Sequence, residues 1–440
     1  MNFLEKIQNT LYSKYFEASF LDIDDLKKTQ HDSMYEIERF QYENIERFIR
    51  ILIKDNSFWK EHIKKSGFSE KTEWTAQNFS ALPIMNKAVY KQQSRMLYLV
   101  RRPCQRIYQD TTSGTSGVPW VFFTDNYSQF WRYILSLRSN IWAGYREGTD
   151  IFLQILMRPI PGAFRKGNFF SFKNRHSIIE AKDYFADLSV HKYLVAYGFV
   201  EFFRALSECI QTGILEPIHI RSVITCGETL TISERERFES VFKTVVYNSY
   251  STREFGRIAQ ECKEKNGLHY HAERFLIEIV DAEGKKVPEG RMGKVIITDF
   301  YNFATPFLRF ATEDWGYMAT TRCRCGMTLP RLYFAEREID KITVERGEIN
   351  AHVLTGAFNK RTRYVNRYQI IQNTLYTFEV RVVPTEQYSI ATWVGIREDL
   401  QKVLGEKALF SCVLTNHDAL CRNGKYILFI NEFLRKKNFL

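Results

Sequence analysis

The order of apolar and polar residues predicts a helix near the start of the chain and an α/β region after it. Four apolar residues have the i, i+3, i+4, i+7 spacing of one helix face: Ile45, Phe48, Ile49 and Leu52. Beyond Pro83, short runs of β-branched and aromatic residues alternate with helical patterns. The predicted strands are Phe152–Met157, His219–Thr225, Thr244–Tyr247, Phe275–Val280 and Lys294–Thr298, and the predicted helices are Tyr197–Thr212 and Ser233–Phe242. This alternation is typical of an α/β fold, which is the fold class we expect.

The C-terminal part of the chain has a different order of elements. We predict strands over Phe378–Val383 and Ile390–Val394, a helix over Ile396–Leu404 that ends at Gly405, and strands over Phe410–Leu414 and Tyr426–Ile430. The prediction is therefore a large N-terminal α/β domain over residues 1–336 with a helical segment at its start, a hinge at 337–341, and a smaller, mobile α+β domain over 342–440.

A loop of small residues precedes the strand-like run at residues 121–123. Its sequence is Asp110-Thr111-Thr112-Ser113-Gly114-Thr115-Ser116-Gly117-Val118-Pro119. Glycine lets several backbone N–H groups face one anion, and hydroxyls add neutral donors, so the loop is a candidate site for the phosphates of ATP. The lysine of a Walker loop is absent. On the loop alone, a surface turn is the alternative.

Composition fits a large globular enzyme. The chain has 440 residues, of which 45% are hydrophobic, which is enough for a large core and a second domain. No apolar run reaches about 18 residues, and the first residues do not resemble a signal peptide, so we expect a cytoplasmic protein without a membrane span. The net charge of +11 suits an anionic ligand, but Lys and Arg are scattered, which favours a solvated surface over a nucleic-acid groove.

Five further motifs follow the loop along the chain. They are Thr225-Cys226-Gly227-Glu228, Tyr250-Ser251-Thr252-Arg253-Glu254-Phe255-Gly256, Leu308-Arg309-Phe310-Ala311-Thr312-Glu313-Asp314, Glu336-Arg337-Glu338-Ile339-Asp340 and Asn423-Gly424-Lys425. In this order they resemble the adenylate-forming superfamily of acyl-CoA ligases, and most closely its phenylacetate-CoA ligase and CapK-like branch. The resemblance extends from Leu82-Pro83-Ile84 to the C-terminus.

The resemblance implies a set of ATP-binding residues. The loop would hold the β- and γ-phosphates through Thr112, Ser113, Gly114, Thr115, Ser116 and Gly117. Ser116 and Val118 replace the family's commoner Thr and Lys, so phosphate binding would depend on N–H and hydroxyl donors.

The base, ribose and hinge positions are also implied by the resemblance. Gly227 and Glu228 would form one wall of the adenine pocket, with the ring of Tyr250 on the other side. Asp314 would accept hydrogen bonds from the ribose hydroxyls, although its motif lacks the family's glycine. Arg337 fits the hinge arginine, and Asp340 is a better hinge candidate than Ile339.

Two residues would carry the chemistry. Glu254 matches the glutamate that holds Mg²⁺ beside the phosphates, as a hard oxygen ligand does, whereas Ser251 in the same motif stands where the family usually has glycine. Lys425 matches the catalytic lysine of the C-terminal domain, whose ammonium would stabilise charge during adenylation. The alternative for Lys425 is a solvated side chain after an Asn-Gly turn.

A second constellation suggests a structural zinc site. Eight cysteines are too sparse for a disulfide scaffold, but Cys262, His269, Cys323 and Cys325 have types and spacing that suit tetrahedral Zn²⁺, with His271 as a substitute for His269. Similar elements occur in the CapK-like branch. Thiols without a metal are the alternative.

The predicted function is ATP-dependent activation of a small-molecule carboxylate as an acyl-adenylate, with release of pyrophosphate and transfer of the acyl group to CoA. Transfer to an amine, which the resemblance to CapK-like proteins of polysaccharide pathways suggests, or to a carrier protein is the second hypothesis. A non-catalytic nucleotide-binding protein is the third. No nucleic-acid partner is expected, and a homodimer is left open.

Overall fold

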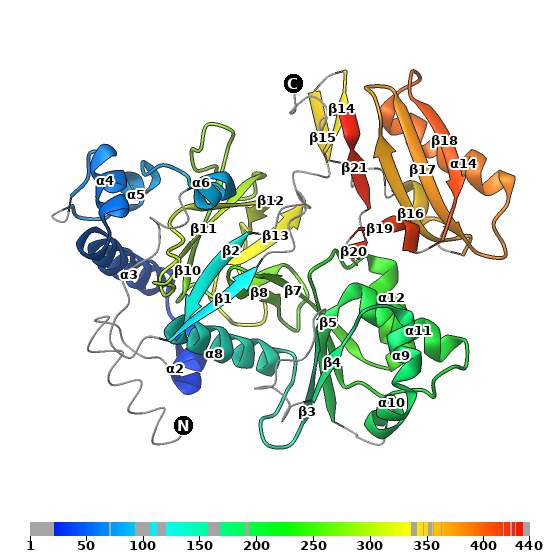
Figure 1. Ribbon diagram of the computed structural model, residues 1–440, viewed down its shortest axis with the longest axis horizontal. Helices are drawn as coiled ribbons and strands as arrows, with labels where there is room; N and C mark the ends of the chain where they lie inside the picture. Colours follow the sequence, from blue (N-terminus) through cyan, green and yellow to red (C-terminus); the bar gives the residue numbers. More distant parts are fainter. Residues whose placement is uncertain are drawn as a thin grey trace. The chain divides into compact units, whose positions relative to one another are not determined.

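The chain forms two compact units. The computed structural model describes residues 22–69, 72–92, 106–111, 120–156, 168–189, 193–335, 341–345, 347–350, 354, 356–361, 363–416, 418–422, 425–426 and 428–433. Unit 1 comprises Met1–Asp150 and Tyr247–Phe334, and unit 2 comprises Ile151–Val246 and Ala335–Leu440 (Figure 1). The hinge predicted at 337–341 falls almost entirely outside the described residues, so the domain boundary stays a prediction.

Unit 1 is built on antiparallel strand pairs. The strands are β7 (Val245–Thr252), β8 (Gly256–Glu261), β9 (Leu268–Tyr270), β10 (Phe275–Val280), β11 (Gly293–Asp299), β12 (Phe310–Met318) and β13 (Arg331–Ala335), and their order in the sheet is β10-β11-β12-β13-β9-β8-β7. A separate antiparallel pair joins β1 (Ile107–Thr111) to β2 (Val121–Asp125), with Thr111 opposite Val121. These two strands flank the predicted phosphate loop, whose residues 112–119 lie outside the described residues.

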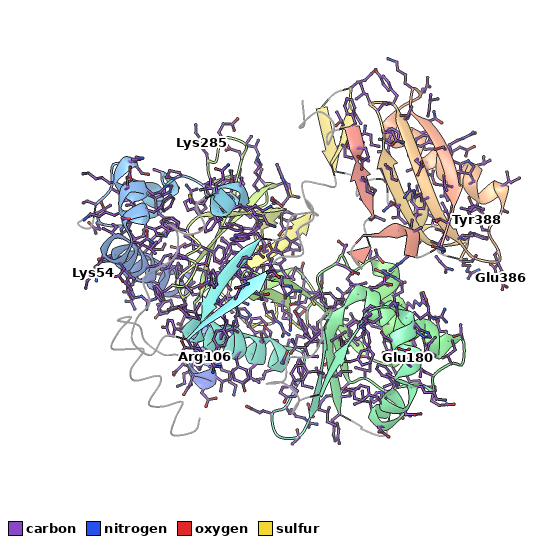
Figure 2. The ribbon with its side chains drawn as sticks, viewed as in Figure 1. Lys54, Arg106, Glu180, Lys285, Glu386 and Tyr388 are labelled. Atoms are coloured by element: carbon purple, nitrogen blue, oxygen red, sulfur yellow. The ribbon has the colours of Figure 1, made fainter. Side chains whose placement is uncertain are left out.

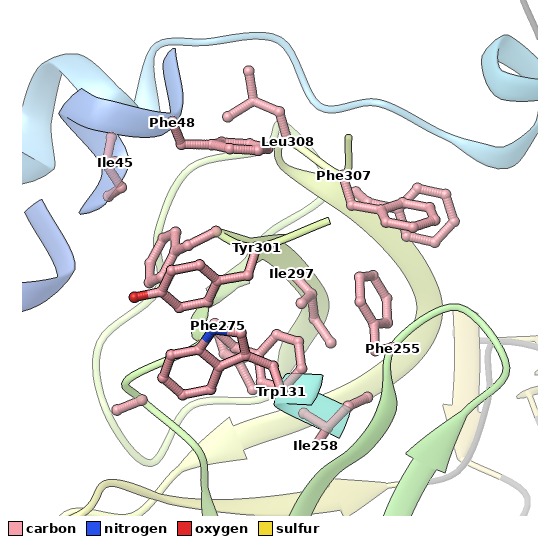
Figure 3. Packing of buried hydrophobic residues seen from close by; sticks show 14 of the residues in the cluster. Ile45, Phe48, Trp131, Phe255, Ile258, Phe275, Ile297, Tyr301, Phe307 and Leu308 are labelled. Atoms are coloured by element: carbon pink, nitrogen blue, oxygen red, sulfur yellow. The ribbon is translucent and has the colours of Figure 1, made fainter. Parts of the chain in front are cut away.

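Six helices are described in unit 1: α2 (Ile23–Thr29), α3 (Met34–Asp55), α4 (Ser57–Lys65), α5 (Ala76–Ser80), α6 (Lys87–Gln92) and α8 (Asn126–Trp142). The apolar face predicted from the spacing is confirmed, because Ile45, Phe48, Ile49 and Leu52 all lie buried in α3. A Ser33–Glu36 capping box begins this helix. In the core, Trp131 of α8 stacks on Tyr301 with ring centroids 4.4 Å apart (Figure 3).

The first part of unit 2 is a parallel α/β layer. Its strands β3 (Ile151–Leu156), β4 (Asn168–Ser171), β5 (Leu194–Phe199) and β6 (Ser222–Cys226) pair in parallel in the order β6-β5-β3-β4. The helices α9 (Arg175–Glu180), α10 (Lys182–Ser189), α11 (Val200–Gln211) and α12 (Ile232–Phe242) accompany them (Figure 1). The predicted α/β fold class is confirmed. The predicted helix over 197–212 starts too early, because residues 197–199 belong to β5.

The C-terminal part of unit 2 mixes helices and strands. Its elements are β14 (Lys341–Val344), β15 (Gly347–Asn350), α13 (Gly356–Asn359), β16 (Val365–Gln372), β17 (Thr377–Pro384), α14 (Ile390–Leu404), β18 (Leu409–Leu414), β19 (Cys421–Arg422), β20 (Lys425–Tyr426) and β21 (Phe429–Asn431). The strand predicted over Ile390–Val394 is wrong. Ser389 and Thr392 form a capping box, so this β-branched and aromatic run opens helix α14 instead.

Charged side chains lie mainly on the surface of each unit. Lys54, Lys285 and Glu180, for example, are exposed (Figure 2). Within the described ranges, no helix combines the length and the apolar character needed to cross a membrane.

One buried ion pair anchors the core of unit 1. Arg274 and Asp299 are fully buried, and the guanidinium donates to both carboxylate oxygens at 3.1 and 2.7 Å. The same carboxylate accepts from the backbone N–H of Tyr301 at 3.0 Å. If one partner of such a pair is removed, the other is left as an uncompensated buried charge, which destabilises the fold.

Asp299→Ala should therefore lower the free energy of unfolding by about 3–5 kcal/mol, because it leaves a buried guanidinium without its carboxylate. Urea unfolding followed by tryptophan fluorescence measures this. The control is Glu46→Ala, which breaks the exposed Arg50–Glu46 pair and should cost less than about 1 kcal/mol. Similar losses in the two variants would contradict the assignment.

Candidate functional site

Strand β1, which precedes the predicted phosphate loop, is tied to the Glu254 turn. Asp110, near the end of β1, accepts a hydrogen bond from the backbone N–H of Thr111 at 2.8 Å and pairs with the guanidinium of Arg253 at 3.2 Å. This pair links the first strand of the loop to the turn between β7 and β8.

Arg132 of α8 fixes the same turn from the other side. Its guanidinium donates to the carbonyl oxygen of Arg253 at 3.1 Å and to that of Glu254. Burial, with the nearby charge of Arg274, lowers the pKa of Arg132 to about 10, so it stays charged at neutral pH. Glu254 is thereby held in a fixed turn that lines a shallow hollow together with Lys87, Thr252, Phe255, Phe310, Ala311, Thr312 and Glu313.

Ser251, which stands where the family usually has glycine, lies in strand β7. The register of β7 and β8 shifts between Tyr250 and Ser251, which is a β-bulge, and Ser251 remains in the strand. The left-handed backbone conformation is found at Gly256, with φ of 76°. Within this motif, the residue whose backbone conformation favours glycine is therefore Gly256.

Tyr250 and Asp314 meet side by side. The phenol of Tyr250 donates to the Asp314 carboxylate at 2.5 Å, and the ring of Tyr250 lies against that of Phe334, with centroids 3.9 Å apart. The backbone N–H of Asp314 donates to Thr312 Oγ1 at 3.2 Å, and this hydroxyl donates to the Val295 carbonyl at 3.0 Å. The carboxylate is thus held at a defined place on β12.

The backbone is left-handed at the position where the Asp314 motif lacks the family's glycine. Glu313 occupies that position with φ of 69°, the left-handed region that glycine adopts without cost. Glu313 thus adopts a conformation that glycine would adopt at a lower cost. Its exposed side chain lines the hollow beside Glu254.

Gly227 and Glu228 follow β6 in unit 2. Gly227 has φ of 77°, and a Cβ there would lie 2.9 Å from the ring of Phe199, so two independent constraints require glycine. Glu228 accepts a hydrogen bond from the backbone N–H of Glu201 at 3.1 Å, in the first turn of α11. The side chain therefore caps a helix that has no cap from its own preceding residue.

The four predicted zinc ligands come together in unit 1. One ligand atom from each of Cys262, His269, Cys323 and Cys325 lies within 4.8 Å of all the others. The Cys262 and Cys323 sulfurs are 3.6 Å apart, and the Cys325 sulfur is 3.4 Å from His269 Nε2. Tetrahedral zinc with Zn–S of about 2.3 Å and Zn–N of about 2.0–2.1 Å would require about 3.8 and 3.5 Å. The geometry fits the ion.

The protonation of the histidine and cysteine side chains in this cluster also suits metal binding. His269 Nδ1–H donates to the Leu329 carbonyl at 2.7 Å, which leaves Nε2 with a lone pair facing the thiols. Burial lowers the pKa of His269 to about 4, so the ring is neutral at pH 7. Burial raises the pKa of Cys262 to about 12, whereas for Cys323 hydrogen bonds from Cys325 and Cys262 outweigh burial and lower the pKa. Metal binding would replace the remaining thiol protons.

His271 is not a substitute ligand. The cationic Arg138 donates to His271 Nδ1 at 2.6 Å, so the ring proton is on Nε2, which donates to Ser139 Oγ at 2.9 Å. Both ring nitrogens are therefore engaged in hydrogen bonds, and neither has a lone pair to offer to a metal. Burial and the adjacent arginines hold the pKa of His271 well below its usual value.

Several other predicted residues cannot be placed by side-chain geometry. Arg337 and the loop residues 112–117 lie outside the described residues. For Lys425 only the backbone is described: it lies in β20, paired with Arg422 of β19 across a two-residue gap. Asn423 and Gly424 lie outside the described residues, so the Asn-Gly turn and the catalytic role of Lys425 both stay predictions.

Sequence reasoning did not identify Arg132 and Lys87. No local motif marks Arg132, whose partners lie 121 and 122 residues away. Lys87 follows Leu82-Pro83-Ile84 closely in the sequence. Its closeness to the start of the family resemblance was the one signal that could have marked it as a site residue.

Comparison with known proteins supports the predicted resemblance. No family model matches the chain. A phenylacetate-coenzyme A ligase of Thermus thermophilus is 28% identical over 159 residues, which cover 34% of this chain and 34% of that ligase. Protein CapK of Staphylococcus aureus is 22% identical over 332 residues, 71% of this chain and 69% of CapK.

The fold has close structural neighbours. 2-Hydroxyisobutyryl-CoA ligase, solved in the postadenylation state with 2-HIB-AMP, superimposes with a TM-score of 0.78 over 96% of both chains at 18% identity. The chain therefore has the fold of the adenylate-forming ligases, and in sequence it is similar to their phenylacetate-CoA ligase and CapK branch.

Proposed function

We propose that this protein is an ATP-dependent ligase that activates a carboxylic acid and transfers its acyl group to CoA. A carboxylate oxygen attacks the α-phosphorus of ATP, the bridging bond to the β-phosphate breaks, and pyrophosphate leaves with the electron pair. The CoA sulfur then attacks the acyl carbon, AMP leaves, and the thiol proton passes to solvent. Fold similarity and the match to phenylacetate-coenzyme A ligase support this class of reaction.

The observation that carries the proposal is the grouping of Tyr250, Asp314 and Glu254 in unit 1. Tyr250 donates to Asp314 at 2.5 Å, and four residues later the same segment presents Glu254 to a hollow shared with Thr312 and Glu313. An aromatic ring, a positioned carboxylate and a second carboxylate beside hydroxyls suit a base, a ribose and a metal-bound phosphate respectively.

Each group has a proposed task. Asp314 accepts hydrogen bonds from the ribose hydroxyls, and Tyr250 and Gly227–Glu228 enclose the adenine. Glu254 holds Mg²⁺, whose charge offsets that of the phosphates. Residues 112–117 bind the β- and γ-phosphates, Arg337 serves the hinge at 337–341, and Lys425 of the C-terminal domain approaches the α-phosphate.

Zinc has a structural role in this proposal. Three sulfurs and one nitrogen complete a tetrahedral shell, so no position remains for substrate. The ion would tie the segment after β8 to the loop at 323–325, both of which follow site motifs in the sequence.

The alternative acceptor is an amine. Similarity to CapK covers 71% of this chain, about twice the share matched by phenylacetate-coenzyme A ligase. In this case an amine nitrogen attacks the acyl carbon of the adenylate and an amide forms. A phosphopantetheinyl carrier protein is a third acceptor to include in the test.

A pyrophosphate-release screen across a carboxylate library tests the function. Each acid is offered with MgATP alone and then with CoA, an amino sugar or a carrier protein. Release that depends on the carboxylate supports adenylation, and the acceptor that accelerates AMP formation identifies the second step. Failure of every acid to release pyrophosphate, with ATP binding intact, would favour a non-catalytic nucleotide-binding protein.

Asp314→Ala should weaken ATP binding by about tenfold to a hundredfold, because two ribose hydroxyls lose their acceptor. Calorimetry with ATP and with 2′,3′-dideoxy-ATP separates this role from a general defect. Wild-type protein should prefer ATP, whereas the variant should bind the two nucleotides alike. If the variant keeps the full preference for ATP over the dideoxy nucleotide, Asp314 does not bind the ribose hydroxyls.

Lys425→Ala should slow pyrophosphate release by about a hundredfold or more, which is the scale for loss of a preorganised charge donor. Acyl transfer from presynthesised acyl-AMP should persist, because the lysine acts only in adenylation. Lys402→Ala, an exposed lysine of α14, is the matched control. Equal loss in both half-reactions would indicate a folding or hinge defect, and no loss in either would support a solvated turn lysine.

Protein purified without chelator should contain about one zinc per chain by elemental analysis. The Cys323→Ser and Cys325→Ser double variant should lose it, while Cys412→Ser, which lies outside the cluster, should retain it. Acidification should release the metal, because protons compete for the sulfurs and the imidazole. A zinc content unchanged by the double variant would refute the site.

A further inference from the structure

One cation in the hollow beside Glu254 has no assigned task. Lys87 lines this hollow with Thr252, Thr312 and two carboxylates, Glu254 and Glu313. Of the described residues that line the hollow, Lys87 alone has a basic side chain. The predicted phosphate loop, in turn, has Val118 where the family commonly has lysine. Lys87 thus places a cation beside Glu254, whereas the sequence of the loop lacks the lysine that the family commonly has.

The backbone fixes Lys87 at this place. Met85 forms a parallel bridge with Phe310 of β12: its N–H donates to the Arg309 carbonyl and its carbonyl accepts from Ala311 N–H, both at 2.9 Å. Arg309 also donates to the carbonyl oxygens of Ser80 and Leu82. The segment that leads into α6 is therefore tied to the strand that carries Thr312 and Asp314.

The ammonium of Lys87 is not needed to form its helix. Asn86 caps α6 by accepting from the Val89 N–H at 3.0 Å. The buried Tyr90 anchors the helix, and its phenol donates to the Pro306 carbonyl at 2.7 Å. A charge placed in a lined hollow without a structural task is a candidate for ligand binding.

Arg253 is a weaker candidate for the same role. Its guanidinium pairs with Asp110 at 3.2 Å, which engages it at the base of the loop. We infer that Lys87 binds the terminal phosphates of ATP and the released pyrophosphate, in place of the lysine that the loop lacks. This inference rests on the proposed function and adds a residue to its phosphate site. The hydroxyl of Thr252 adds a neutral donor, and Glu254 supplies the metal ligand.

Calorimetry with inorganic pyrophosphate and Mg²⁺ tests the inference without catalysis. Lys87→Met should weaken pyrophosphate and ATP binding by about tenfold to a hundredfold, because a charge-assisted contact is lost. AMP binding should not change, because AMP carries no terminal phosphates. Lys87→Arg should restore most of the affinity. Lys91→Met, one turn further along α6, is the matched control and should bind pyrophosphate like the wild type.

The half-reactions give a second readout. Lys87→Met should raise the KM for ATP in pyrophosphate release and leave acyl transfer from presynthesised acyl-AMP unchanged. Unaltered pyrophosphate binding in Lys87→Met, with wild-type binding intact, would overturn the inference, as would equal weakening of AMP. Pyrophosphate release absent already in the wild type would instead refute the proposed function, and the calorimetry would still decide the role of Lys87.

Discussion

The geometry of the site in unit 1 depends on one buried arginine. Arg309 is 1% exposed and pairs with the Glu278 carboxylate through two contacts of 2.9 and 3.0 Å. Its remaining donors hold the carbonyl oxygens of Ser80 and Leu82, and its φ of 45° turns the chain into β12. Because one charged group joins three segments, losing it would displace both the Lys87 segment and the start of the strand that carries Asp314.

The Cys/His cluster and the Arg138 network join further segments of unit 1. Arg138 is buried and pairs with Glu273, which also accepts from the hydroxyl of Thr29 at 2.8 Å at the end of α2. The loop after Cys325 meets the same helix end, because Thr328 N–H donates to the Gln30 carbonyl at 2.9 Å. Bound zinc would therefore restrict a loop that is hydrogen-bonded to the end of helix α2.

Elements with local signals could be predicted from the sequence, and long-range contacts could not. The stripe from Ile45 to Leu52 and the Cys-x-Cys-Gly turn each carry their own pattern, and both lie where the sequence indicated. The run Ile390–Val394 suggested a strand because its cap, Ser389, is a weaker signal than its residue types. The contact of Arg309 with Ser80 spans 229 residues and follows from tertiary packing, which no local pattern encodes.

A crystal structure with Mg²⁺ and a non-hydrolysable ATP analogue tests the central claim, that Arg309 organises a nucleotide site on β12 and the β7–β8 turn. The account predicts ribose hydroxyls within hydrogen-bond distance of Asp314, a metal on Glu254, and a terminal phosphate oxygen beside the Lys87 ammonium. Nucleotide bound at another place, with Asp314 and Glu254 making no contact to it, would contradict the account.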